Sequence, residues 1–150
     1  MNFDFETLPH HWINRLGFLI RRELQDEFHA AGLDISAEEW AVLLFLWRQD
    51  GLNPGELAAF TVRDPTTMTR MLDSMSRKNL VARQIDPVDR RKYRVCLTPY
   101  AKEIRPKLVA CAQALIARSV VDVDPGDLAV TVKVLKTLTE NILNKADGDA

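Results

Sequence analysis

The chain has 150 residues, of which 47% are hydrophobic and 27% charged, as is usual for a single globular domain. Its two cysteines are too few for a disulfide framework, and its longest apolar run, residues 40–47, is too short to span a bilayer. Because Asp4 and Glu6 precede any apolar run, we expect no signal peptide, no membrane association and a cytoplasmic location.

Capping residues mark the helix starts along the chain. Ser36 and Glu39 have capping-box spacing, and four further capping residues each precede a proline: Asn53, Asp64, Thr98 and Asp124. The predicted helices are residues 8–31, 36–49, 54–61, 65–79, 99–121 and 125–145. Residues 81–85 and 93–97 have strand composition and enclose a polar turn, which predicts a hairpin. The predicted fold class is mainly α with a small β-hairpin wing: a winged helix-turn-helix with long helices at both ends.

The net charge of −1 is unevenly distributed. Residues 61–94 contain nine basic and four acidic side chains, a net charge of +5, so the rest of the chain carries −6. This asymmetry indicates an anion-binding surface within residues 61–94.

The helix predicted at residues 65–79 has the features of a DNA-recognition helix. Its apolar side carries Met68, Met71, Leu72 and Met75. Hydroxyl, guanidinium and carboxylate groups lie opposite, on Thr66, Arg70, Asp73 and Arg77. A short helix and a four-residue turn precede it, which is helix-turn-helix spacing. An ordinary solvated face is the alternative interpretation. Together with the basic hairpin tip, the predicted DNA-contacting residues are Thr66, Thr67, Thr69, Arg70, Arg77, Asp89, Arg90, Arg91 and Lys92.

The long terminal helices carry apolar stripes with spacing near 3.5 residues. The stripes are Ile13, Leu16, Ile20, Leu24 and Phe28; Ile104, Leu108, Cys111, Leu115 and Ile116; and Leu128, Val132, Leu135, Leu138 and Ile142. Packing within the chain is one interpretation, but the middle module is small, so a partner chain is the simpler one. We therefore expect one domain, residues 1–150, with a winged module at 36–98 and homodimerisation helices at 1–35 and 99–150.

A few further residues are candidates for ligand, metal or catalytic groups. Trp12, Arg15 and Trp40 could line an apolar pocket with one cation for an aromatic carboxylate, although each tryptophan alone suits a core position. The three histidines lack metal-ligand spacing, and no catalytic motif is present, so we expect no metal, no cofactor and no enzyme activity. Cys96 and Cys111 suit inert core positions better than sensor positions.

The stretch from Leu57 to Thr98, LAAFTVRDPTTMTRMLDSMSRKNLVARQIDPVDRRKYRVCLT, resembles the signature of the MarR family, and the order of the flanking helices agrees. The resemblance implies a triangular dimer built from the terminal helices. It also implies that Arg91 enters the minor groove while Asp89 braces the wing by pairing with an arginine. Many members of that family leave DNA when small aromatic ligands bind between the dimer helices and the DNA-binding module.

The sequence therefore predicts a dimeric DNA-binding regulator that recognises an inverted-repeat operator in double-stranded DNA. The expected mode of action is repression relieved by a small aromatic or phenolic ligand. Two alternatives remain: a thiol-redox-responsive regulator, and a dimeric winged-helix module that binds proteins rather than DNA.

Overall fold

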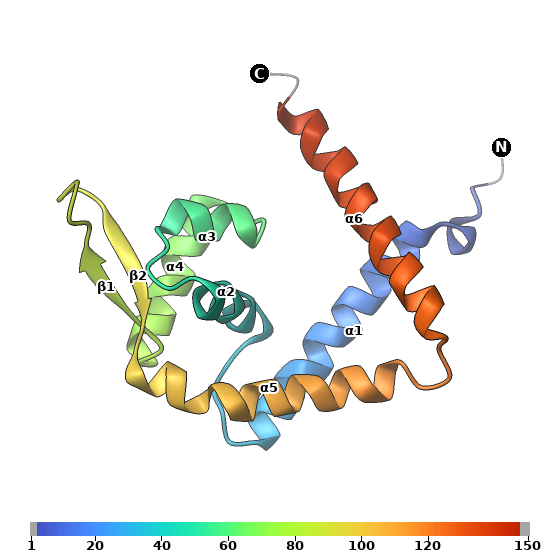
Figure 1. Cartoon of the computed structure of the whole chain (residues 1–150), viewed down its shortest axis with the longest axis horizontal. Helices are drawn as coiled ribbons and strands as arrows, with labels where there is room; N and C mark the ends of the chain where they lie inside the picture. The colour runs from blue at the N-terminus through green and yellow to red at the C-terminus, as the bar shows by residue number, and fades with distance from the viewer. Residues whose placement is uncertain (1–2, 148–150) are drawn as a thin grey trace. The chain divides into compact units, whose positions relative to one another are not determined.

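The computed structural model describes residues 3–147, and its elements follow the predicted order (Figure 1). In chain order they are a 3-10 turn η1 (Phe5–Thr7), α1 (Pro9–Ala30), α2 (Ala37–Arg48), α3 (Pro54–Phe60), α4 (Pro65–Arg77), β1 (Val81–Ile85), β2 (Tyr93–Leu97), α5 (Pro99–Ser119) and α6 (Pro125–Asp147). The predicted fold class is confirmed. The chain divides into two compact units, Met1–Leu115 and Ile116–Ala150, which are described separately below.

Local capping explains where the helices begin. At α2, the Ser36 hydroxyl accepts a hydrogen bond from the Glu39 amide, and the Glu39 carboxylate accepts one from the Ser36 amide, both at 3.0 Å. Asn53 and Glu56 form a second reciprocal box at α3. The remaining predicted caps each accept from an amide of the first helical turn: Asp64, Thr98 and Asp124. These bonds satisfy amides that a helix leaves without partners at its start.

The turn between α3 and α4 contains a residue in an unfavourable backbone conformation. The Arg63 amide donates to the Ala58 carbonyl at 2.9 Å, which requires Val62 to adopt a left-handed conformation with φ of 53°. A β-branched residue rarely occupies this region, because its side chain crowds the backbone. The Val62 side chain is 77% exposed, so it gains little from packing.

Replacing Val62 by glycine is expected to raise the free energy of unfolding by about 1 kcal/mol, because glycine adopts positive φ without steric cost. Urea denaturation followed by circular dichroism measures the change. Asn79→Gly is the control, since Asn79 also has positive φ (58°) but belongs to a residue type that tolerates it. A Val62→Gly variant no more stable than the wild-type chain would contradict the assigned strain.

The hairpin is antiparallel and pairs Val81 with Leu97 and Ile85 with Tyr93. A third segment, missed by the sequence analysis, extends this sheet: Leu52 bridges to Val95, whose amide donates to the Leu52 carbonyl at 2.8 Å. This bridge attaches the base of the hairpin to the segment between α2 and α3. The far end of the hairpin projects away from the helices of its unit (Figure 1).

The core of the first unit is built by helices α1 to α5 and the hairpin. Its fully buried side chains include Phe28, Leu43, Leu46, Leu57, Met68, Leu72, Met75, Leu80, Val95 and Leu108. The predicted apolar side of α4 is therefore confirmed. The apolar stripe of α1 divides in two, because Leu24 and Phe28 are buried whereas Ile13, Leu16 and Ile20 are exposed.

The stripe of α5 packs mostly within its own chain, contrary to the expectation that it faces a partner. Ile104, Leu108 and Leu115 are at most 8% exposed and belong to the core, whereas Ile116 is 59% exposed. By contrast, the described part of α6 up to Lys145 contains no buried side chain. The exposed apolar residues of α6 include Val132, Leu135 and Ile142.

Candidate DNA-binding surface

Helix α4 presents a polar face that the packing of its opposite face leaves free. Met68, Leu72 and Met75 pack against the core, and the side chains on the opposite side of the helix point away from it. Thr66, Arg70 and Arg77 are exposed, as the helical periodicity predicted. Of the two flanking threonines, Thr69 is exposed and Thr67 is half-buried.

The hydroxyl groups near the start of α4 are already engaged. Asp64 accepts hydrogen bonds from the Thr67 amide at 2.9 Å and from the Thr67 hydroxyl at 2.5 Å. These bonds to Thr67 hold the pKa of the Asp64 carboxyl below its usual value. The Thr69 hydroxyl donates to the Pro65 carbonyl at 3.0 Å. A DNA contact by Thr67 or Thr69 stays a prediction. Because each hydroxyl hydrogen is already donated within the module, the hydroxyl oxygen would have to accept a hydrogen bond from the DNA.

An ion pair joins α4 to the wing. Asp73, which the sequence placed on the free polar face, is paired with Arg83 of β1. The Arg83 guanidinium also lies 5.1 Å from the centre of the Tyr93 ring on β2. Hydrogen bonding to Asp73 raises the pKa of Arg83. Asp73 therefore stabilises the wing through its ion pair with Arg83 and is not a free group on the polar face. The sequence did not identify Arg83 in this role.

The turn of the wing is organised by Asp86. Its carboxylate accepts hydrogen bonds from the amides of Val88 and Asp89, at 2.8 and 3.1 Å, and from Arg94 Nε at 3.2 Å. The two amide bonds, more than Arg94, lower the pKa of Asp86. The resemblance implied that Asp89 pairs with an arginine side chain, but Asp89 instead accepts from the backbone amide of Arg91 at 3.0 Å. Asp86 provides the ion pair, with Arg94.

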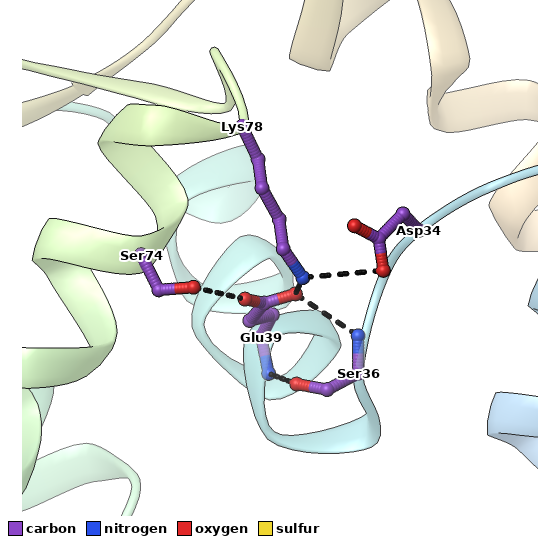
Figure 2. A network of polar contacts seen from close by, with 5 residues as sticks. All are labelled: Asp34, Ser36, Glu39, Ser74 and Lys78. Atoms are coloured by element: carbon purple, nitrogen blue, oxygen red, sulfur yellow. Dashed lines mark hydrogen bonds and ion pairs between the residues drawn. The ribbon is translucent and has the colours of Figure 1, made fainter.

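A buried carboxylate fixes the other end of α4 (Figure 2). Glu39, 4% exposed, accepts from Lys78 Nζ at 3.0 Å and from the Ser74 hydroxyl at 3.3 Å, besides its bond to the Ser36 amide. Lys78 also lies 3.5 Å from Asp34. The capping residue of α2 therefore also attaches the last turn of α4 to the module.

Replacing Glu39 by alanine is expected to lower the free energy of unfolding by about 1–3 kcal/mol, since a buried network loses its common acceptor. Chemical denaturation gives the value. The control is Glu38→Ala, one residue away: Glu38 forms an exposed ion pair with Arg63 at 3.8 Å, so about 0–1 kcal/mol is expected. Equal losses from the two variants would show that the network adds nothing beyond an ordinary surface pair.

The three residues proposed for an aromatic ligand are not brought into one cavity. Trp12 and Arg15 lie on the exposed part of α1, and the Trp12 indole donates to the Glu6 carbonyl at 2.9 Å. Trp40 packs against the core, 5.4 Å from the Phe28 ring and 5.5 Å from the Trp47 ring. The groove that Arg15 lines includes neither tryptophan in its wall.

Both cysteines are half-buried and free. Burial, and secondarily the Asp50 carboxylate, raises the pKa of Cys96. A raised pKa leaves less thiolate at neutral pH, so Cys96 is expected to react more slowly with iodoacetamide at pH 7.5 than glutathione does. A Cys111→Ser variant isolates this reaction for mass spectrometry. Labelling as fast as glutathione would instead favour the thiol-redox alternative.

Two negative findings concern the part of the chain that the structure describes. No helix there is long and apolar enough to cross a membrane. Within residues 3–147, no three histidine, cysteine or acidic side chains gather closely enough to hold a metal ion.

Together, the α3–α4 pair, its tight turn and the hairpin attached to α4 define a winged helix-turn-helix module. Comparison with known proteins is consistent with this class. Residues 35–93 match the model of the MarR family. The match spans most of the winged module, and the chain is similar in fold to solved MarR-family transcriptional regulators.

Solved structures of regulators resemble the chain over nearly its whole length. A MarR-family regulator from Silicibacter pomeroyi is 28% identical over 92% of each chain, with a TM-score of 0.76. AbsC from Streptomyces coelicolor is 23% identical, over 96% of this chain and 98% of its own, with a TM-score of 0.82. CouR from Rhodococcus jostii RHA1, solved with p-coumaroyl-CoA, is 20% identical, over 91% and 95% of the two chains, with a TM-score of 0.77. No curated protein sequence matches significantly.

Proposed function

We propose that the chain is a homodimeric, sequence-specific DNA-binding repressor that a small aromatic ligand releases from an inverted-repeat operator. One observation carries the DNA-binding part of this proposal. All four carboxylates within residues 61–94 accept hydrogen bonds from their own module: Asp64, Asp73, Asp86 and Asp89.

The basic side chains of the same segment divide into two groups. Four are paired with carboxylates: Arg63, Lys78, Arg83 and Arg94. Five are exposed and have no ion-pair partner in the described chain: Arg70, Arg77, Arg90, Arg91 and Lys92. The unpaired cations lie on α4 and on the wing. Cations without internal partners on a recognition helix and a wing suit phosphate and base-edge contacts.

Within this proposal, Arg70 and Arg77 of α4 face the major groove, and Arg90, Arg91 and Lys92 lie along an adjacent minor groove. The narrow minor groove attracts arginine through its negative potential. Two such modules in a two-fold dimer would read half-sites about one helical turn apart. CouR, crystallised with an aromatic thioester, supports a small-molecule effector for this fold.

Selection of bound DNA from a random pool, followed by titration of the selected site at two salt concentrations, tests the proposal. An inverted-repeat consensus is expected, with affinity falling steeply as salt rises because bound cations release counterions from DNA. An asymmetric consensus would contradict the two-fold model. Absence of DNA binding at low salt would favour the protein-interaction alternative instead.

A further inference from the structure

The wing carries the most exposed large apolar side chain of the described residues. Val88, in the turn between β1 and β2, is 90% exposed, and Ile85 at the end of β1 is 71% exposed. Among residues 81–97, no other large apolar side chain is exposed. Val88 gains little by packing within its own module, so the free energy of burying its isopropyl group is available to a binding partner.

Hydrogen bonds hold the backbone around Val88. The Asp86 carboxylate accepts from the amides of Val88 and Asp89, at 2.8 and 3.1 Å. The Asp86 amide donates to the Lys92 carbonyl at 3.0 Å, which closes the turn. Pro87 fixes its own φ, and a β-branched side chain such as valine has few accessible rotamers. Val88 is therefore held in one place, and ordering it in a complex costs little conformational entropy.

The charges beside Val88 indicate which partner covers it. Arg90, Arg91 and Lys92 follow it closely along the chain, and each is exposed without an ion-pair partner in the described chain. The end of the hairpin that carries them projects away from the helices of its unit (Figure 1). Cations around an apolar group suit a polyanion that also offers an apolar surface, which is a description of duplex DNA.

DNA offers apolar surface to a side chain in both of its grooves. The major groove presents the thymine methyl group, and the minor groove is lined by sugars and accepts apolar side chains. Helix α4 occupies the major groove in the proposed function, which leaves the minor groove to the wing. The floor of that groove differs between base pairs: A·T pairs present only acceptors, whereas G·C pairs add the N2 amino group of guanine.

We infer that Val88 is a specificity-determining residue, whose isopropyl group lies on the floor of the minor groove and disfavours G·C pairs there. The guanine amino group projects from the floor into the space that the isopropyl group occupies, and an A·T pair leaves this space open. Valine also has no acceptor for the amino group, and covering a donor without an acceptor is costly. This inference rests on the proposed function, because it assigns one contact within the DNA complex.

The cations of the wing also favour A·T pairs, but for a different reason. Arginine responds to the negative potential of a narrow minor groove, and cation–phosphate attraction weakens as salt rises. The contact between an isopropyl group and the floor of the groove involves no net charge. We therefore expect the preference due to Val88 to persist at high salt and to follow the guanine amino group alone.

Duplexes that differ in one base pair of each half-site test the inference. Hydroxyl-radical footprinting of the wild-type chain on its selected operator locates the minor groove that the protein protects beside each half-site. One pair there is made A·T, G·C or inosine·C. Inosine lacks the amino group, so its pair with C has the minor-groove groups of an A·T pair. In fluorescence anisotropy, the wild-type chain should bind the A·T and inosine·C duplexes equally and the G·C duplex about tenfold more weakly per half-site.

Variants of the wing assign this preference to one side chain. Val88→Thr keeps the shape and replaces a methyl group by a hydroxyl, which can accept from the guanine amino group. This variant should discriminate less than about threefold between A·T and G·C per half-site, at low and at high salt. Ile85→Thr is the matched control and should keep the wild-type ratio, since Ile85 pairs with Tyr93 within the strands and lies outside the turn. Arg91→Ala should weaken binding to every duplex and leave the G·C duplex the weakest.

The inference is overturned if the wild-type chain binds the G·C and inosine·C duplexes equally, if Val88→Thr keeps the full preference, or if Ile85→Thr loses it. In each of these cases the operator is still bound, so the DNA-binding proposal stands and only the role of Val88 fails. A wild-type chain that selects no operator overturns both proposals.

Discussion

Replacing Arg70 by alanine is expected to cost about 1–3 kcal/mol of operator affinity per half-site and to relax base preference at one position. Arg70 projects from the exposed face of α4, and its guanidinium makes no ion pair in the described chain. Removing it should abolish the one proposed base contact but leave the fold intact, because the core contacts of α4 come from Met68, Leu72 and Met75. Two half-sites double the loss for the dimer.

Arg91→Ala should have a different signature. Arg91 lies on the wing tip, where its amide donates to Asp89 while its side chain is exposed. Alanine retains the amide bond and removes only the cation. We therefore expect weaker binding with an unchanged major-groove consensus and a dependence on salt that is less steep by about one phosphate contact per half-site.

Fluorescence anisotropy at several salt concentrations, combined with selection from a random pool, measures both effects. Lys107→Ala on α5 is the matched control, because it removes an exposed cation outside residues 61–94. The roles assigned to Arg70 and Arg91 would be wrong if both variants lost affinity equally, with the same consensus and the same salt dependence.

The features that sequence predicted well are local ones. A capping residue, the proline after it and the amide it accepts from lie within four residues, so Asn53, Asp64, Thr98 and Asp124 mark helix starts without knowledge of the fold. The exposed face of α4 follows from helical periodicity once its apolar side is buried. The hairpin follows from two β-rich segments around a polar turn.

The features that sequence missed are contacts between distant elements. Glu39 meets Lys78 across 39 positions, and only the packing of α2 against α4 brings them together. The same holds for the bridge between Leu52 and Val95. Side-chain type also failed to predict a shared pocket, since Trp12 and Arg15 lie on the exposed part of α1 whereas Trp40 packs against Phe28 and Trp47.

The charge pattern indicated a candidate region but not the roles of its side chains. The sequence contains nine cations and four carboxylates in residues 61–94. Helical periodicity placed Asp73 on the outward-facing side of its helix, and the family resemblance implied that Asp89 pairs with an arginine. The structure engages Asp73 with Arg83 and Asp89 with a backbone amide. Which cations stay unpaired in the described chain is therefore a tertiary property, and it defines the proposed DNA-binding surface more narrowly than net charge does.

The second large effect concerns dimerisation. Replacing Leu16 and Ile142 together by aspartate is expected to convert a dimer into a monomer of about 17.1 kDa. Both side chains are exposed in the single chain, at 53% and 66%, on helices whose apolar residues have no cover there. A helix such as α6, with no buried side chain up to Lys145, is stabilised in water mainly by tertiary packing, which a second copy would supply.

Light scattering at micromolar concentration measures the mass, and the wild-type chain should give about twice 17.1 kDa. The control is Val88→Asp, which places the same charge on a wing residue that is 90% exposed, and this variant should remain dimeric.

Operator affinity of the Leu16→Asp, Ile142→Asp variant should fall by about 10²–10⁴, because the second half-site is no longer held at high effective concentration. A monomeric wild-type chain that binds an inverted repeat equally well would contradict the two-fold model. In a dimer, each aspartate enters the interface twice and must be desolvated without a partner, so the loss of association should exceed what the lost apolar area alone would cause.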